Sequence, residues 1–316
     1  MIPYQLGNLS QLEYLSLERN SLAGAIPSQL GRLTHLQYLA LSDNIIDGQI
    51  PYALGNLSQL QYLDLGYNSL SGALPFHVGN LPMLETLKLN FILDLKINDG
   101  KWLSTLTSLT NFALSGFSHQ WLQIINKLLP KLIELRLSRC QLSDNDIYSL
   151  FHSHSNFSTS LTILDLSENM LTLSTFHLLS NFSITLHELY LSKNNIMSFP
   201  LYLSFPSLVI LDLSYNNLAS STFQGISNFG SKLKVLRLRL CNLSDNNFHA
   251  TSPSIMNSSS SVDILVLSRN LLTLAIFHWI FNFTTNLHTL DLGGNLLEGP
   301  IPNGFGTEMR SIEVLS

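Results

Sequence analysis

The 316-residue sequence predicts a solenoid of stacked repeats, curved into a right-handed superhelix with a parallel sheet on its concave face. Leucine supplies 68 residues, and the leucines recur in the template LxxLxLxxN. Apolar residues come in short runs broken by Ser, Asn and Gly, whereas a membrane-spanning helix needs about 20 consecutive, mostly apolar residues. The mean hydropathy of +0.22 therefore reflects many short core segments, and no membrane-spanning segment is expected.

The template keeps one register along the chain. Twelve complete templates occur, mostly 22 to 25 residues apart, and a thirteenth begins at Ile312. This spacing is typical of leucine-rich repeats, an α/β repeat class that is here largely β with 3-10 and irregular segments. The first residues of the complete templates are Leu12, Leu36, Leu60, Leu84, Leu109, Leu132, Leu161, Leu186, Leu208, Leu233, Val262 and Leu287.

We expect one solenoid domain over residues 1–316, because a repeat array grows in one dimension. The repeats near 84–131 are irregular, and those at 132–160 and 233–261 run to 29 residues. Their extra residues, around Asp144–Asn156 and Asp245–Ser261, lack template leucines, so we expect them on the outer face or edge and outside the core. Both ends of the sequence fall within a repeat, which predicts an uncapped internal fragment.

Within each repeat, the L-x-L segment predicts a short strand with one buried face. Stacked repeats place these strands in a parallel sheet, about 4.8 Å apart. The Asn that closes the template is expected to turn inward and bind backbone groups at the end of the strand. Cys140 and Cys241 occupy the same position, which predicts two buried substitutes for Asn. Four repeats separate them, so a disulfide is not expected.

Charge and motifs exclude several classes of function. The net charge of −5, from 16 Lys and Arg against 21 Asp and Glu, argues against a nucleic-acid-binding surface. No P-loop, GxSxG, HExxH or kinase signature is present, so we expect no enzyme and no cofactor. His152-Ser153-His154 lacks a third metal ligand. One strand position carries a repeated carboxylate, expected to be a solvated consensus residue: Asp64, Asp165, Asp212 and Asp291.

Several repeats continue past the Asn into a second motif, as in Gly24-Ala25-Ile26-Pro27 followed by Leu30-Gly31. Gly48-Gln49-Ile50-Pro51, Gly72-Ala73-Leu74-Pro75 and Gly299-Pro300-Ile301-Pro302 repeat it. The pattern resembles the plant-specific class of leucine-rich repeats, found in ectodomains of plant receptor-like kinases and receptor-like proteins. That resemblance implies a second short strand beside the first sheet.

The middle of the chain resembles a narrower group. Trp102-Leu103-Ser104, the segment 121–128 and Leu137-Ser138-Arg139-Cys140 are similar to receptor-like proteins related to the fungal ethylene-inducing-xylanase receptors, which have no kinase domain. This resemblance implies an extracellular segment of a plasma-membrane receptor in defence or developmental signalling. It also implies that the receptor binds a peptide or protein ligand and acts with a co-receptor kinase. The alternative is a secreted inhibitor of a cell-wall-degrading enzyme, although such inhibitors have fewer repeats.

Sequons predict where glycans attach. Seven N-x-[ST] strings occur, and six of them fall four or five residues before the next template, which places them in one outer column of the solenoid. In a secreted chain we expect glycosylation at Asn8, Asn56, Asn156, Asn181, Asn242, Asn257 and Asn282.

Cations and tyrosines at outward-facing strand positions predict a ligand-binding surface on the concave face. Tyr14, Tyr38 and Tyr62 precede the second leucine of the first three repeats. The candidate ligand-binding residues, from the sixth repeat on, are Arg136, Arg139, Tyr190, Lys193, Tyr215, Arg237, Arg239 and Arg269. The alternative is a ladder of neutralised charges, in which Arg136 faces Asp165 and Arg237 faces Asp212.

Overall fold

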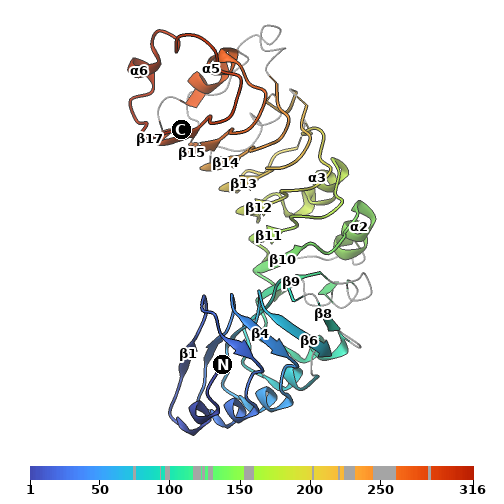
Figure 1. Ribbon diagram of the computed structural model, residues 1–316. Helices are drawn as coiled ribbons and strands as arrows, with labels where there is room; N and C mark the ends of the chain where they lie inside the picture. The colour runs from blue at the N-terminus through green and yellow to red at the C-terminus, as the bar shows by residue number, and fades with distance from the viewer. Residues whose placement is uncertain are drawn as a thin grey trace. The chain divides into compact units, whose positions relative to one another are not determined.

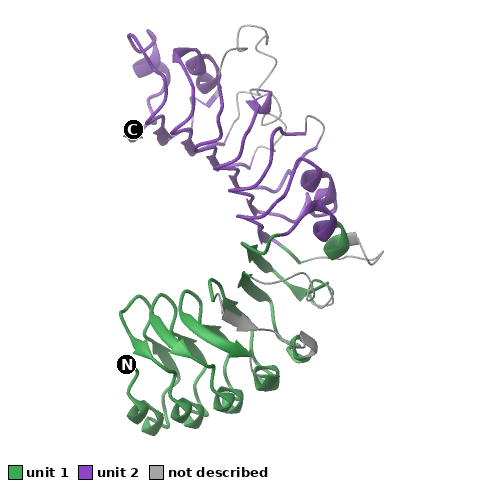
Figure 2. Ribbon diagram, turned by 45° about the vertical axis from the view of Figure 1, so that its right-hand side comes forward, with its two compact units in different colours: residues 1–141, 148–161 green, residues 142–147, 162–316 purple. Residues whose placement is uncertain are grey.

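The chain forms two compact units in the computed structural model (Figures 1 and 2). Unit 1 comprises residues 1–141 and 148–161, and unit 2 comprises residues 142–147 and 162–316. The prediction of a single solenoid domain stays a prediction. The structure describes residues 1–73, 76–92, 94–96, 100–116, 122, 125–126, 131–152, 160–200, 203–219, 221–223, 232–244, 261–283 and 286–316.

Unit 1 carries a parallel sheet with one strand from each repeat, as the L-x-L segments predict. Its strands follow one another in chain order, and template leucines pair with template leucines, as Leu15 pairs with Leu39 and Leu39 with Leu63. The strands are β1 (Tyr14–Ser16), β3 (Tyr38–Ala40), β5 (Tyr62–Asp64), β7 (Thr86–Leu89), β9 (Asn111–Ser115) and β10 (Glu134–Ser138).

A second, smaller parallel sheet in unit 1 confirms the extra strand implied by the Gly-x-Ile-Pro motif. It contains β2 (Ala23–Gly24), β4 (Ile45–Gly48), β6 (Ser69–Ala73) and β8 (Asp94–Lys96). Each repeat then closes through a short 3-10 helix, and these helices lie in a row on the side away from the first sheet (Figure 2). They are η1 (Tyr4–Asn8), η2 (Ser28–Arg32), η3 (Tyr52–Asn56), η4 (Phe76–Asn80) and η5 (Gly100–Thr105).

Unit 2 has the same pattern of short parallel strands in chain order. Its strands are β11 (Ile163–Asp165), β12 (Glu188–Tyr190), β13 (Ile210–Asp212), β14 (Val235–Arg237), β15 (Ile264–Val266), β16 (Thr289–Asp291) and β17 (Val314–Leu315). Its described helices are α3 (Ser174–Leu178), η8 (Ser180–Phe182), η10 (Leu274–Ile276), α5 (Phe277–Ile280), η11 (Phe281–Phe283) and α6 (Phe305–Glu308).

Template residues form the core of both units. Leu39 and Leu63 in unit 1, and Leu164, Leu166 and Leu211 in unit 2, have no exposed surface. Burying a leucine side chain contributes about 1.5–3 kcal/mol relative to leaving it in water. The predicted leucine core is therefore confirmed in each unit, and the fold is a leucine-rich-repeat solenoid.

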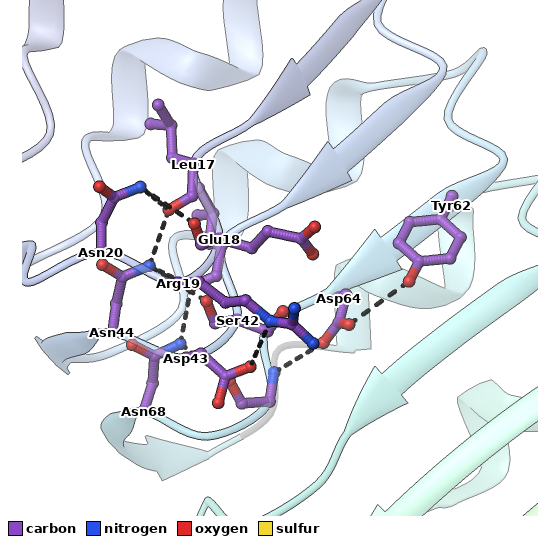
Figure 3. A network of polar contacts seen from close by, with 12 residues as sticks. Leu17, Glu18, Arg19, Asn20, Ser42, Asp43, Asn44, Tyr62, Asp64 and Asn68 are labelled. Carbon is purple, nitrogen blue, oxygen red and sulfur yellow. Dashed lines mark hydrogen bonds and ion pairs between the residues drawn. The ribbon is translucent and has the colours of Figure 1, made fainter. Parts of the chain in front are cut away.

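The closing asparagines form the predicted ladder of amides (Figure 3). Asn44 donates from Nδ2 to the carbonyl of Leu17 at 2.8 Å and to the carbonyl of Leu41 at 3.1 Å, while its Oδ1 accepts from the Leu22 amide at 2.9 Å. Asn68 repeats this arrangement one repeat on. In unit 2 the same bonds recur at Asn194, Asn216 and Asn270.

Both cysteines take the asparagine position, as predicted. Cys140 and Cys241 are buried thiols and form no disulfide with each other. The Cys241 thiol donates to the Leu213 carbonyl at 3.1 Å, where an asparagine amide would donate. Burial raises the pKa of this thiol to about 12, so it stays protonated and keeps its weak donor.

The first long repeat contradicts the expectation that its extra residues stay outside the core. Residues 144–152 form helix α2 (Asp144–His152), which spans the boundary between the units and buries Ile147, Leu150 and Phe151. Helical spacing places these three residues on one face, which the absence of template leucines concealed. Of the second extension, residues 245–260 lie outside the described residues.

In the described part of the chain, no helix combines the length and the apolar character needed to cross a membrane.

Candidate ligand-recognition surface

The eight candidate residues lie at three positions of the repeat. Arg136, Tyr190 and Arg237 occupy the outward-facing strand position between two template leucines. Arg239 is the residue directly after the third template leucine of its repeat. The remaining four directly precede the closing residue of the template and have positive φ: Arg139, Lys193, Tyr215 and Arg269. Arg136 and Arg139 belong to unit 1, and the other six belong to unit 2.

In unit 1, both candidate arginines have partners within the unit. Arg136 forms an ion pair with Glu134 of its own strand, and the two side chains are 29% and 13% exposed. The Arg139 guanidinium lies over the Phe91 ring, 5.2 Å from its centroid. Both cations are therefore engaged in contacts that stabilise the repeats.

In unit 2, three candidates also contact one another or a carboxylate. The Tyr190 hydroxyl donates to Glu188 at 2.8 Å. Lys193 forms an ion pair with Glu168 at 2.9 Å, and its ammonium lies 5.7 Å from the centroid of the Tyr215 ring. Lys193 and Tyr215 thus form one pair on neighbouring repeats.

Three arginines of unit 2 differ from the rest. Arg237, Arg239 and Arg269 make no ion pair within 4.0 Å with any residue that the structure describes. The Nε of Arg239 is buried and has no hydrogen-bond partner among the described residues. Its side chain stands in a row of small residues, with Ser214 on the repeat before it and Ser268 on the repeat after it. Unit 2 therefore carries three cations on two consecutive repeats that form no ion pair with a described residue.

The repeated aspartates bind backbone amides at the ends of their strands. Asp212 lies opposite Arg237 in the strand register, yet its Oδ1 accepts from the Ser214 amide, 2.9 Å away on its own chain segment. Asp291 accepts from Gly293 in the same way at 3.1 Å. The carboxylates thus bind the backbone where the strand ends, and the expectation of merely solvated residues was incomplete. Arg237 thus faces Asp212, as the alternative of a charge ladder expects, but the two side chains form no ion pair within 4.0 Å.

The tyrosines of the first three repeats form a stack in unit 1. Ring centroids are 4.2 Å apart from Tyr14 to Tyr38 and again from Tyr38 to Tyr62, and the rings are nearly parallel. Lys88, which the sequence pattern did not single out, places its ammonium 5.2 Å from the Tyr62 centroid. A comparison of the residues between the second and third template leucines of neighbouring repeats would have identified Lys88.

Asp64 ends the tyrosine stack with a polar contact (Figure 3). The Tyr62 hydroxyl donates to its Oδ2 at 3.4 Å, and the Gly66 amide donates to its Oδ1 at 3.0 Å. Burial raises the pKa of the Asp64 carboxyl above its ordinary value, and burial raises the pKa of Tyr62 to about 12. The stack is therefore a surface of neutral phenol rings with the Asp64 carboxyl group at one end.

The positive-φ position is a feature that the sequence pattern did not predict. A residue other than glycine in the left-handed region costs about 1–3 kcal/mol of backbone strain. Two repeats have glycine at this position, Gly116 and Gly294, with φ of +78° and +72°. These glycines are the sequence signal from which the positive φ could have been predicted. Non-glycine residues at this position are Arg19, Asp43, Tyr67, Phe91, Arg139, Glu168, Lys193, Tyr215, Leu240 and Arg269.

Four of the predicted glycosylation sites have described side chains. Asn8 and Asn56 end helices η1 and η3 and are exposed, as is Asn181 in η8. Asn242 differs, because its φ is +61° and its Nδ2 donates to the Asn217 side chain at 3.1 Å. Asn156, Asn257 and the side chain of Asn282 lie outside what the structure describes.

No group of three metal-ligating side chains occurs among the described residues. His152 ends helix α2, and residues 153–154 of the His-Ser-His string lie outside them.

The stacked parallel strands, buried leucines and asparagine ladder define a repeat protein of the leucine-rich class. Residues 3–249 match the family model of the leucine-rich repeat region, and residues 286–307 match the leucine-rich repeat. The chain belongs to the leucine-rich-repeat family, and its Gly-x-Ile-Pro motifs and second sheet are of the plant type.

The solved structures that are similar to this chain include plant receptor ectodomains. The ectodomain of the Arabidopsis receptor kinase HAESA, solved with the peptide hormone IDA and the co-receptor SERK1, is 25% identical with a TM-score of 0.61, and the match covers 99% of this chain and 55% of that one. The ectodomain of the Arabidopsis thaliana receptor kinase GASSHO1/SCHENGEN3, solved with CASPARIAN STRIP INTEGRITY FACTOR 2, is 26% identical with a TM-score of 0.51, covering 99% and 42%.

A bacterial structure shares the fold alone. An internalin from Listeria monocytogenes is 20% identical with a TM-score of 0.63, covering 98% of this chain and 87% of that one. This chain spans about half the length of the plant ectodomains. No curated protein matches it significantly.

Proposed function

We propose that this chain is the ligand-recognition segment of an extracellular, plasma-membrane receptor-like protein of plants. It is non-catalytic, binds a peptide or protein on the sheet face of unit 2, and acts with a co-receptor kinase. The plant ectodomains solved with a bound peptide hormone support this function, because they share both fold and repeat type with this chain. The narrower resemblance to the ethylene-inducing-xylanase receptor group favours a role in defence.

The observation that carries the proposal is the set of unneutralised arginines. Arg237 and Arg239 share one repeat and Arg269 lies on the next, while the neighbouring Asp212 accepts from the Ser214 amide of its own repeat. An arginine offers planar, bidentate recognition of a carboxylate, and arginine and tyrosine are enriched at binding hot spots. The ligand that fits is an extended peptide with an acidic side chain or a free carboxylate.

The other five candidates take supporting roles. Arg136, Arg139, Tyr190, Lys193 and Tyr215 are already engaged with partners in their own units, so a ligand would gain less from them. Lys193 and Tyr215 nevertheless lie on the repeats that precede Arg237 and extend the surface along unit 2.

Selection from a library of linear peptides with free carboxyl ends tests this function and needs no identified ligand. The secreted chain is the bait, and the selected peptides are then measured against Arg237→Ala with Arg239→Ala. We expect affinity to fall at least tenfold, which corresponds to about 1.4 kcal/mol. The comparison variant is Tyr14→Ala with Tyr38→Ala in unit 1. Loss in the tyrosine variant alone moves the site to unit 1, and unchanged affinity in both removes the sheet face as the site.

A further inference from the structure

Helices η1 to η4 of unit 1 carry almost no charge. Across helices η1 to η4, Arg32 is the one residue with a formal charge. Three aromatic side chains at the first position of these helices are instead strongly exposed: Tyr4 at 60%, Tyr52 at 61% and Phe76 at 64%. Exposed apolar surface of this kind marks a place where something binds or covers the protein.

Two of these aromatics join into one exposed cluster. The His77 ring lies 3.9 Å from the Phe76 ring and 5.0 Å from the Tyr52 ring, measured between centroids. The helices themselves pack closely, because Gly31 and Gly55 leave room for the backbone of the next helix. The aromatic side chains therefore stand on a rigid support.

Sequons accompany the exposed tyrosines. Tyr4 begins η1 and the sequon residue Asn8 ends it, and Tyr52 and Asn56 are placed in the same way in η3. The helix between them has neither feature, since η2 begins with Ser28 and ends with Arg32. Asn8 and Asn56 are exposed, and their side chains make no hydrogen bond to any described residue. Tyrosine and sequon thus occur together or are both missing in these three helices.

We propose that N-linked glycans at Asn8 and Asn56 fold back over Tyr4 and Tyr52 and cover the almost uncharged surface of helices η1 to η4. The inference rests on the proposed extracellular function, because the glycan is added in the secretory pathway. In that reaction Nδ2 of the asparagine bonds to C1 of the first N-acetylglucosamine and loses a proton, while the lipid pyrophosphate of the donor oligosaccharide leaves.

The glycan and the surface of helices η1 and η3 are chemically complementary. A 3-10 helix rises about 2.0 Å per residue, so the tyrosine lies about 8 Å along the helix from its asparagine, within reach of the first sugars. A sugar ring offers a face of C–H groups that packs on an aromatic ring, while its hydroxyls stay in water. The neutral sugars need no charged partner, and η1 and η3 contain none. The covered face is then closed to protein partners, which leaves recognition to the sheet side.

Glycan release from the folded, secreted chain tests the inference. Mass spectrometry of glycopeptides first measures occupancy at Asn8, Asn56 and Asn181. Peptide N-glycosidase then removes glycans from the native protein, and the release rate is followed at each site. We expect release at Asn56 to be at least threefold faster in Tyr52→Ser than in the parent chain, with release at Asn181 unchanged. Tyr14→Ser is the matched control, because Tyr14 is equally exposed at 60% but lies in strand β1.

The outcomes separate this inference from the proposed function. Equal release rates at Asn56 in the parent chain and in Tyr52→Ser overturn the packing of glycan on tyrosine. Empty Asn8 and Asn56 beside an occupied Asn181 overturn the inference and leave the proposed function standing. A secreted chain with none of the three sites occupied contradicts both.

Discussion

At the scale of single residues, the closing asparagine does more than fill a consensus position. Asn216 donates to the carbonyls of Leu191 and Leu213 and accepts from the Ile196 amide, so one side chain joins neighbouring repeats. It is 6% exposed, and its partners would be buried and unpaired without it. An unpaired buried polar group costs about 1–3 kcal/mol.

Asn216→Ala should therefore lower the free energy of unfolding by about 2–4 kcal/mol, since it leaves more than one backbone group unpaired. Chemical denaturation measures the loss. Asn20→Ala is the matched control, because Asn20 holds the same position at an exposed site and bonds only to carbonyls of its own repeat. A loss at Asn216 no larger than at Asn20 would mean that the ladder adds nothing across repeats.

The aspartate at the strand position predicts a dependence on pH in unit 1. Burial raises the pKa of Asp64, so the folded state binds a proton more readily than the unfolded state does. Ionised Asp64 therefore costs stability at neutral pH, and the cost is relieved as the pH falls through the raised pKa toward the ordinary value of 3.8.

Asp64→Asn should raise the free energy of unfolding at pH 7, and the gain should vanish below the ordinary pKa of 3.8, where the parent carboxyl is protonated in both states. The asparagine oxygen still accepts from the Gly66 amide. Urea denaturation at both pH values measures the effect, with Asp212→Asn as the comparison at the same strand position of unit 2. A gain that persists at low pH would show that charge burial is not its cause.

At the scale of elements, the short helices of unit 1 approach one another because glycine allows it. A Cβ on Gly31 would lie 2.3 Å from the carbonyl oxygen of Ala53 in the next helix, and one on Gly55 would lie 2.5 Å from that of His77. Both contacts are to backbone, which cannot rotate away. The Leu-Gly pair of the motif is thus a condition for stacking the repeats.

Gly31→Ala should destabilise the chain by about 1–3 kcal/mol, the usual cost of overpacking. Thermal unfolding followed by circular dichroism detects it. Gly306→Ala is the control, because its Cβ would meet nothing within 4 Å in helix α6 and alanine is the better helix former. Equal stability of the two variants would contradict the close packing of η2 on η3.

The elements also show what the sequence could predict. The strands and the buried leucines follow from a strict period, because each repeat meets a neighbour built on the same pattern. The second sheet was implied by the resemblance to plant-type repeats. Helix α2 could not be predicted from this period. Its buried residues Ile147, Leu150 and Phe151 fit no repeat template, so the sequence pattern assigns them to a polar extension. Local helical periodicity within one irregular segment is weaker evidence than a period seen twelve times.

At the scale of the whole chain, the proposed function depends on which cations form no ion pair with other repeat residues. The sequence predicted the residues of the candidate surface but not their partners. Arg136 pairs with Glu134 of its own strand, and the Asp212 carboxylate accepts from the Ser214 amide. Both contacts are local to the end of one strand, and the register between neighbouring strands does not predict them. Of the eight candidates, we propose Arg237, Arg239 and Arg269 as the main ligand contacts, because they make no ion pair with a described residue.

The free energy of unfolding of two sets of variants tests most directly whether these arginines serve binding or stability. Glutamine keeps much of the side-chain stem and removes the charge. Arg237→Gln with Arg239→Gln should not lower the free energy of unfolding, because neither guanidinium loses an ion pair with a described residue and the buried Nε of Arg239 has no described hydrogen-bond partner to lose. Arg136→Gln should cost about 1–3 kcal/mol, because Glu134, only 13% exposed, loses its ion-pair partner. A double variant as destabilised as Arg136→Gln would show that Arg237 and Arg239 hold the repeats together, and would contradict their assignment to the ligand.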